Sequence, residues 1–289
     1  MHRGPRVTRR KGAGAKAARV SPGSARSLLL TLLGEFLYPE NRPAWTSPLL
    51  HGLAGVGIAE KAGRQALARA AQAGWMESTP SGRRAEWRLT DHGRRLISEG
   101  SRRLRSLRAE GARWGGEWLV LHVTLPEARR EDRLRTYRAL AWLGFGNPTP
   151  GIWISPDPAR APQAKQLIAD LRLGELTLAL QAKPLDFGVP PAVLVRQAWD
   201  LDAVATHYEA LVGRFGQLRP RSPDDILFAH IELVNALQRL PSLDPGLPPE
   251  LLPAGWTRRL QAERLWALRE RWHAPAHARW DELSVQVDS

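Results

Sequence analysis

Residues 59–89 read AEKAGRQALARAAQAGWMESTPSGRRAEWRL and contain the clearest structural signal in the chain. Apolar residues recur along one side of the first part and a glycine follows it, so we expect a helix from Ala59 to Ala73. Two runs that favour strands come next, at 75–78 and 84–89, on either side of a Thr-Pro-Ser-Gly turn. The stretch therefore predicts one helix and a β-hairpin in succession.

Two further helices precede this stretch. The leucine-rich run at 28–37 stops at Tyr38-Pro39, where proline cannot continue a helix. A second helix should begin at Thr46-Ser47-Pro48, an N-cap hydroxyl followed by a proline suited to the first turn, and end at Gly55 and Gly57. Three helices, a hairpin and a further basic helix form a winged helix-turn-helix, which places its third helix in the major groove of DNA.

Long polar side chains, most of them cationic, occupy the parts of this fold that would meet DNA. They are Lys61, Arg64, Gln65 and Arg69 on the third helix, and Arg83, Arg84 and Arg88 on the hairpin. We expect Arg64, Gln65 and Arg69 to read bases or hold the adjacent backbone, and Lys61 to bind phosphate. Each feature alone is typical of a solvated face, but the order of the elements favours DNA binding.

The composition favours a polyanionic partner and limits the chemistry. A formal net charge of +13 and a pI near 11.1 suit binding to double-stranded DNA. The chain has no cysteine, and no apolar run approaches the roughly 20 residues that span a membrane, so we expect a cytoplasmic protein.

Capping explains Asp224 and Asp225 better than a metal site with His230 and Glu232, which do not share one helix face with them. We expect no metal, no cofactor and no catalytic residue, and therefore not an enzyme.

The remaining sequence indicates an α+β protein with several parts. Strand-like runs at 118–125, 151–155 and 175–180 alternate with helices at 130–143 and 163–173, which favours a ferredoxin-like α/β domain. Helices at 202–215, 224–240 and 256–272 follow, with the proline-rich segment 241–253 expected on the surface. The expected parts are a disordered basic arm (1–24), the winged helix (25–97), a linker helix (98–116), the ferredoxin-like domain (117–198), a helical domain (199–280) and a tail (281–289).

Several short motifs resemble the PaaX-type family, which are repressors of phenylacetate catabolism. They are Leu33-Gly34-Glu35-Phe36, residues 64–69 with Gly74-Trp75, Trp87-Arg88-Leu89-Thr90, residues 140–146, residues 150–156, Trp199-Asp200-Leu201, and residues 244–253. The resemblance extends from Ser27 to about Trp272. It implies a winged helix, a ferredoxin-like domain akin to a small CRISPR-adaptation nuclease, and a helical C-terminal domain. It also implies a homodimeric repressor that phenylacetyl-CoA releases from its operator.

The residues themselves say little about such an effector. A CoA thioester needs an apolar slot for its acyl group and cations for its phosphates. Trp153, Trp199 and Trp256 are candidates for the slot, although core packing is the stronger interpretation of each.

Two other functions stay open. One is a nuclease that uses the ferredoxin-like domain, although its first strand ends Thr124-Leu125-Pro126-Glu127 without an aspartate at the tip. The other is a DNA-binding protein without small-molecule input.

Overall fold

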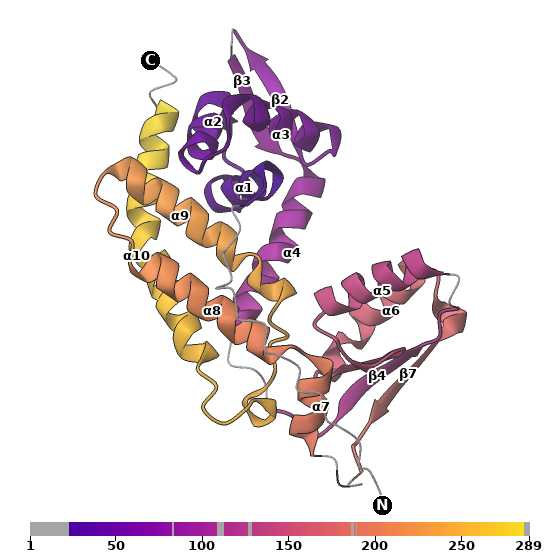
Figure 1. Cartoon of the computed structure of the whole chain (residues 1–289). Helices are drawn as coiled ribbons and strands as arrows, with labels where there is room; N and C mark the ends of the chain where they lie inside the picture. The colour runs from indigo at the N-terminus through magenta and orange to yellow at the C-terminus, as the bar shows by residue number, and fades with distance from the viewer. Residues whose placement is uncertain are drawn as a thin grey trace, which may run out of the picture.

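The computed structural model describes residues 23–82, 84–108, 113–126, 129–185, 188 and 190–285. Residues 1–22 of the predicted basic arm and the hairpin residue Arg83 lie outside the described residues. The rest forms the predicted α+β protein, with a winged helix, a central α/β domain and a helical C-terminal part. The C-terminal helices lie alongside the winged helix, and the central domain is set apart from it (Figure 1).

The winged helix contains the predicted three helices and hairpin, together with one additional short strand. Its strands are antiparallel in the order β1-β3-β2. β1 has two residues, too few for a strand pattern to be recognisable in the sequence. The elements are α1 (Ala25–Leu32), the π-helical turn η1 (Leu33–Leu37), β1 (Ala44–Trp45), α2 (Thr46–Gly55), α3 (Glu60–Gln72), β2 (Met76–Ser81) and β3 (Arg84–Leu89).

No hydroxyl caps α2, contrary to the sequence prediction. The capping position is Trp45, which makes no side-chain cap hydrogen bond. Thr46 Oγ1 instead accepts from the Trp87 indole at 2.9 Å and donates to the Ala85 carbonyl at 3.3 Å. These two bonds fasten the hairpin to the start of α2.

A long helix, α4 (Asp91–Arg108), leads away from the winged helix. The Thr90 hydroxyl caps it by accepting from the Gly93 amide at 3.1 Å. Gly93 must lack a side chain, because a Cβ there would lie 1.9 Å from the Trp75 carbonyl oxygen. The helix therefore starts at a fixed point on the winged helix and runs beside the C-terminal helices (Figure 1), where Leu104 is buried in their core.

The central domain has one strand more than the sequence predicted. Its four strands are antiparallel in the order β5-β6-β4-β7, and the succession βαββαβ is the ferredoxin-like arrangement. The unpredicted strand reads Gly146-Asn147-Pro148-Thr149 and has no apolar alternation. The elements are β4 (Trp118–Val123), α5 (Arg130–Trp142), β5 (Gly146–Thr149), β6 (Ile152–Ser155), η2 (Pro158–Arg160), α6 (Ala161–Asp170), η3 (Gly174–Leu176) and β7 (Thr177–Ala182).

The C-terminal part is helical, as predicted, but it includes an unpredicted helix at 191–198, within the range assigned to the central domain, and its last helix is longer than expected. Instead of stopping at Trp272, that helix passes through Pro275 and includes part of the expected tail. The segment 241–253 is not confined to the surface either, because Asp244, Leu247 and Leu251 are buried. The elements are α7 (Pro191–Ala198), α8 (Leu201–Gly216), α9 (Pro223–Leu237), η4 (Leu240–Ser242), η5 (Pro249–Leu251) and α10 (Arg258–Val285).

The winged helix and the C-terminal helices share one hydrophobic core, which we call the winged-helix junction. Leu227 and Ile231 of α9, and Ala276 and Trp280 of α10, are buried together with the leucines of α1 and α2. The ring of Trp280 stacks on Phe36 with centroids 4.4 Å apart. Helix α10 continues past its proline because these contacts offset the hydrogen bond that proline removes.

Polar groups complete the winged-helix junction. Thr31, which is fully buried in α1, donates to the Gln238 side chain at 2.8 Å. Asp224 lies 3.2 Å from His51 Nε2 and accepts from Arg279 at 2.7 Å, and the bond from Arg279 lowers the pKa of Asp224. Asp225 forms a capping box with Ser222, as the capping interpretation predicted. Each side of the junction therefore supplies hydrogen-bond partners to the other.

The central domain meets the C-terminal part at a second contact, the central junction. Trp118 of β4 and Ile154 of β6 pack with Val195, Leu201, Leu247 and Leu251. Gly146 allows Trp199 to lie against β5, since a Cβ at Gly146 would be 2.5 Å from the indole. The Arg160 guanidinium donates to the Pro245 carbonyl at 3.4 Å. This junction joins one face of the sheet to α7 and to the proline-rich segment.

Candidate DNA-binding face and effector cleft

Helix α3 has one buried and one exposed face, as its sequence pattern predicted. Gly63, Ala66, Leu67 and Ala70 are buried, and Gly74 ends the helix with a φ of +68°. The opposite face exposes all four predicted DNA-contacting side chains: Lys61, Arg64, Gln65 and Arg69. The structure therefore brings these four together on a surface that no other part of the described chain covers.

Arg64 is engaged in an ion pair on that face. Its guanidinium lies 2.7 Å from a carboxylate oxygen of Glu60, one helical turn earlier, and both side chains are more than half exposed. An exposed pair of this kind contributes little free energy, about 0.3–0.5 kcal/mol. Arg64 can therefore exchange Glu60 for a guanine edge or a phosphate at low cost.

The hairpin presents its cations beside α3. Arg84 and Arg88 are exposed on β3, and Arg88 lies 3.3 Å from Glu86. Arg83 belongs to the turn but lies outside the described residues. Because Thr46 fastens β3 to the start of α2, Arg84 has a fixed position relative to the helices.

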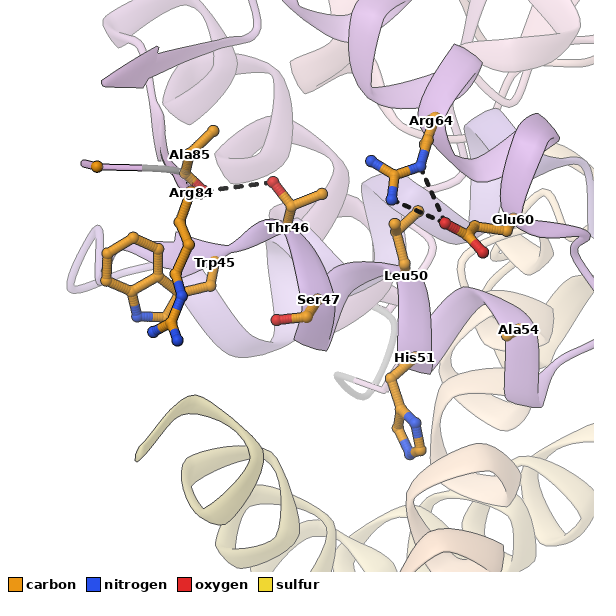
Figure 2. Close-up of a pocket in the computed structure, with 11 residues that line it drawn as sticks. Trp45, Thr46, Ser47, Leu50, His51, Ala54, Glu60, Arg64, Arg84 and Ala85 are labelled. Carbon is orange, nitrogen blue, oxygen red and sulfur yellow. Dashed lines mark hydrogen bonds and ion pairs between the residues drawn. The ribbon is translucent and has the colours of Figure 1, made fainter. Parts of the chain in front are cut away.

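A hollow of about 670 Å³ separates the hairpin from the helices. Figure 2 shows Trp45 and Arg84 on one side of it and the Glu60–Arg64 pair on the other, with Ser47 between them. The sequence analysis did not identify Trp45 or Ser47 as candidates. Both residues stand at the start of α2, where no side chain caps the free backbone amides. Uncapped amides at a helix start can bind an anion such as a phosphate.

The three tryptophans that the sequence suggested for an effector do not meet at one place. Trp153 is buried among the residues under α5 and α6, where it makes an edge-to-face contact with Tyr137 at 5.2 Å. Trp199 and Trp256 are half-buried on the other face of the sheet, at the central junction. All three side chains serve core packing here, which was the stronger interpretation from the sequence.

A cleft of about 990 Å³ lies where α4, the central domain and the proline-rich segment come together. This volume is at the upper end of the range for small-molecule sites. Trp142, at the end of α5, is 45% exposed and provides an aromatic wall. The residues around the cleft include three arginines from different parts of the chain, Arg102, Arg113 and Arg160. The cleft thus combines an aromatic surface with cations, the two features that an acyl-CoA requires.

Asp244 holds the floor of this cleft in place. Its buried carboxylate accepts from the Tyr208 hydroxyl at 2.9 Å and from Arg258 at 2.5 Å. Burial, followed by the charge of Asp244, raises the pKa of the Tyr208 phenol, which therefore stays protonated and remains a donor. Sequence reasoning missed this cleft because its walls come from three distant segments, although Trp142 stands within one of the family-like motifs.

None of the described helices is both long enough and apolar enough to cross a membrane. Three family models match successive stretches of the chain. "PaaX-like protein" matches residues 24–93, "PaaX protein central Cas2-like domain" matches residues 111–194, and "PaaX-like protein C-terminal domain" matches residues 199–282.

Individual proteins agree with these matches. The transcriptional repressor PaaX of Escherichia coli is 29% identical over 252 residues, which are 83% of this chain and 78% of that protein. The solved structure of an uncharacterized protein from Mycobacterium tuberculosis is similar at a TM-score of 0.60 and 27% identity, over 91% of this chain and 99% of the other. The chain therefore belongs to the PaaX family.

Proposed function

We propose that the protein is a transcriptional repressor that binds a duplex operator through α3 and the β2–β3 hairpin. The observation that carries this proposal is the exposed face of α3, with Lys61, Arg64, Gln65 and Arg69 side by side. Arginine can bridge two acceptors of guanine in the major groove, whereas lysine neutralises phosphate. The E. coli relative is named a transcriptional repressor, which supports the same role for this chain.

DNA binding is tested with an operator fragment and a random duplex of equal length. We expect tighter binding to the operator and a steep loss of affinity for both as salt rises, because cationic side chains displace counterions from phosphates. Equal affinity for the two duplexes at all salt concentrations would contradict a sequence-specific repressor.

An aryl-acetyl-CoA such as phenylacetyl-CoA is the proposed effector, and the cleft beside Trp142 is its proposed site. This ligand class comes from the family resemblance, and the combination of Trp142 with Arg102, Arg113 and Arg160 supports it. Release requires the effector to favour a conformation that no longer fits the operator. Moving the population from 99:1 to 1:99 takes about 5.5 kcal/mol of differential affinity.

The effector is tested by titrating the operator complex with phenylacetyl-CoA, free phenylacetate and acetyl-CoA in parallel. We expect only phenylacetyl-CoA to release the DNA, because it alone offers both the aromatic group and the CoA phosphates. Release by all three compounds, or by none, would contradict the proposed effector. The protein would then be a DNA-binding protein without small-molecule input.

A homodimer is the proposed assembly, since a single winged helix reads only a short site and two-fold repressors bind paired half-sites. A second copy of the chain is proposed to pack on the edge strand β7. Leu178 and Leu180 are both exposed on the same side of this strand, which supports the proposal. Exposed apolar edge strands are normally covered. Sedimentation should show a dimer that Leu178→Lys/Leu180→Lys converts to a monomer; a wild-type monomer on operator DNA would contradict the assembly.

The match of residues 111–194 to a Cas2-like domain keeps a nuclease as the second candidate function. Glu127, the acid nearest the end of β4, lies outside the described residues. Incubation of the protein with labelled duplex and Mg²⁺ or Mn²⁺ separates the two functions. A repressor leaves the DNA intact, whereas metal-dependent cleavage that Glu127→Gln abolishes would establish the nuclease.

A further inference from the structure

Four side chains with metal-binding groups meet where η1 of the winged helix touches α9 and α10. They are Glu35, His230, His273 and His277, and one ligand atom from each lies within 4.8 Å of those of the other three. His273 and His277 are one turn apart on α10 and so project from the same face. We call these four residues the Glu–His cluster.

The three distances from the carboxylate oxygen are close to the edge of a tetrahedron around a metal ion, and the histidine nitrogens lie within 4.8 Å of one another. From Oε1 of Glu35, His230 Nε2 lies at 2.8 Å, His273 Nδ1 at 3.2 Å and His277 Nε2 at 3.6 Å. Ligands bound at about 2.0–2.1 Å in a tetrahedral site are about 3.3 Å from one another. Small adjustments of the side chains would thus place all four atoms around one ion.

Burial provides the cluster with a closed floor and an open entrance. His230 is fully buried and the Glu35 side chain is 8% exposed, whereas His273 is 46% and His277 30% exposed. The Nε2 atom of His277 is buried and makes no hydrogen bond, although it points towards the carboxylate. A buried nitrogen without a partner is unfavourable, and a coordinated cation would satisfy it.

Arg269 orients the carboxylate of the cluster. One of its guanidinium nitrogens lies 2.9 Å from each oxygen of Glu35. The three histidines approach Oε1, so Arg269 can retain Oε2 while Oε1 binds an ion. Such outer partners hold metal-binding carboxylates in position in many proteins.

We propose that the Glu–His cluster is a structural site for Zn²⁺ or a similar imidazole-preferring divalent cation. Three imidazole nitrogens and one carboxylate oxygen form a complete four-coordinate set, and four protein ligands with no open position distinguish a structural zinc site from a catalytic one. Its ligands come from the winged helix and from two C-terminal helices, so the ion would clip the DNA-binding part to α9 and α10. This inference does not depend on the repressor function.

The test uses the untagged full chain after treatment with a chelator. Calorimetric titration with Zn²⁺ should give one ion per chain, and Co²⁺ should produce the visible absorption of a tetrahedral complex. The double variant His273→Gln/His277→Gln lacks the two more exposed ligands. It should still fold, and circular dichroism checks that it does. His92→Gln, at an exposed histidine of α4, is the matched control.

We expect the double variant to lose the Co²⁺ spectrum and to bind Zn²⁺ at least about ten-fold more weakly, whereas the control behaves as wild type. Zn²⁺ should raise the Tm of wild type and control but not of the double variant. Failure of the folded wild type to bind either ion at micromolar concentration would overturn the proposal, as would equal binding by the double variant. Operator binding, measured on the same samples, reports separately on the proposed function.

Discussion

The two junctions of the C-terminal helices differ in how completely they are filled. The winged-helix junction is a continuous core in which Trp280 stacks on Phe36 and polar groups such as Thr31 have partners. The central junction also has an apolar contact, around Trp118, but beside it lies a cleft of about 990 Å³. A filled junction resists displacement because protein cores are close-packed, whereas a cleft can accept a ligand.

If the cleft binds the proposed effector, the ligand would touch α4. The cleft is lined by Arg102 of α4, and α4 begins on the winged helix, where Gly93 packs against Trp75. A ligand in the cleft would therefore act on a helix that is anchored at the DNA-binding part.

The largest expected effect comes from breaking the filled junction. Trp280→Ala should lower the free energy of unfolding by about 3–5 kcal/mol, because it empties a buried site at the core of the winged helix. Denaturant unfolding measures the loss, and operator binding should fall with it. Trp142→Ala, at the cleft, is the comparison and should change stability much less. Equal losses would mean that the two junctions do not differ as described.

A second substitution separates DNA binding from both junctions. Arg64→Ala should weaken operator binding by about 1–3 kcal/mol and relax the sequence preference, because Arg64 lies on the exposed face of α3. Fluorescence anisotropy on operator and random duplexes measures both effects, with Arg172→Ala on the central domain as the control. Unchanged affinity for both duplexes would remove Arg64 from the DNA-binding face.

Replacing Trp142 tests whether the cleft binds the proposed effector. Trp142→Ala should weaken phenylacetyl-CoA binding about ten-fold, or ~1.4 kcal/mol, while operator affinity without ligand stays the same. Calorimetry measures the affinity for phenylacetyl-CoA, and fluorescence anisotropy measures the affinity for the operator without ligand. Trp153→Phe, in the packed face of the sheet, should leave the ligand affinity unchanged. The opposite pattern would place the effector elsewhere.

The smallest effect concerns a single hydrogen bond across the filled junction. Thr31→Val keeps the side-chain shape but removes the donor to Gln238, so we expect a loss of about 1 kcal/mol in unfolding free energy. Denaturant unfolding detects this change. Thr177→Val removes a hydroxyl bond within the central domain and is the matched control for the loss of one hydroxyl away from the junction. A Thr31→Val protein as stable as wild type would show that the polar contacts do not strengthen the junction.

The parts that sequence alone predicted are those whose signals are local. Helix α3 and the hairpin show apolar spacing, a terminal glycine and turn residues within about 30 positions, and the structure has both elements. The first strand is longer than predicted, because residues 79–81 of the expected turn pair with β3. Strand β5 has no such pattern, because Asn147 and Pro148 occupy its middle. Helix α10 contradicts a local rule, since Pro275 would ordinarily end it and only packing against distant residues continues it.

The same distinction applies to the candidate sites. The exposed cations of α3 follow from helical spacing and could be named from the sequence. The cleft and the Glu–His cluster could not, because their residues meet only after folding. His230 was considered with its neighbours along α9, yet its partner Glu35 is 195 positions away. Only the pair His273 and His277 has a spacing that could have pointed to a metal site.

The packing of α10 has a consequence for the order of events during synthesis. A ribosome releases the winged helix first, and N-terminal domains ordinarily fold as they emerge. Here Ala276 and Trp280 belong to the core of that first domain, so it cannot be completed until the last helix has been made. A nascent or prematurely terminated chain would lack part of its DNA reader.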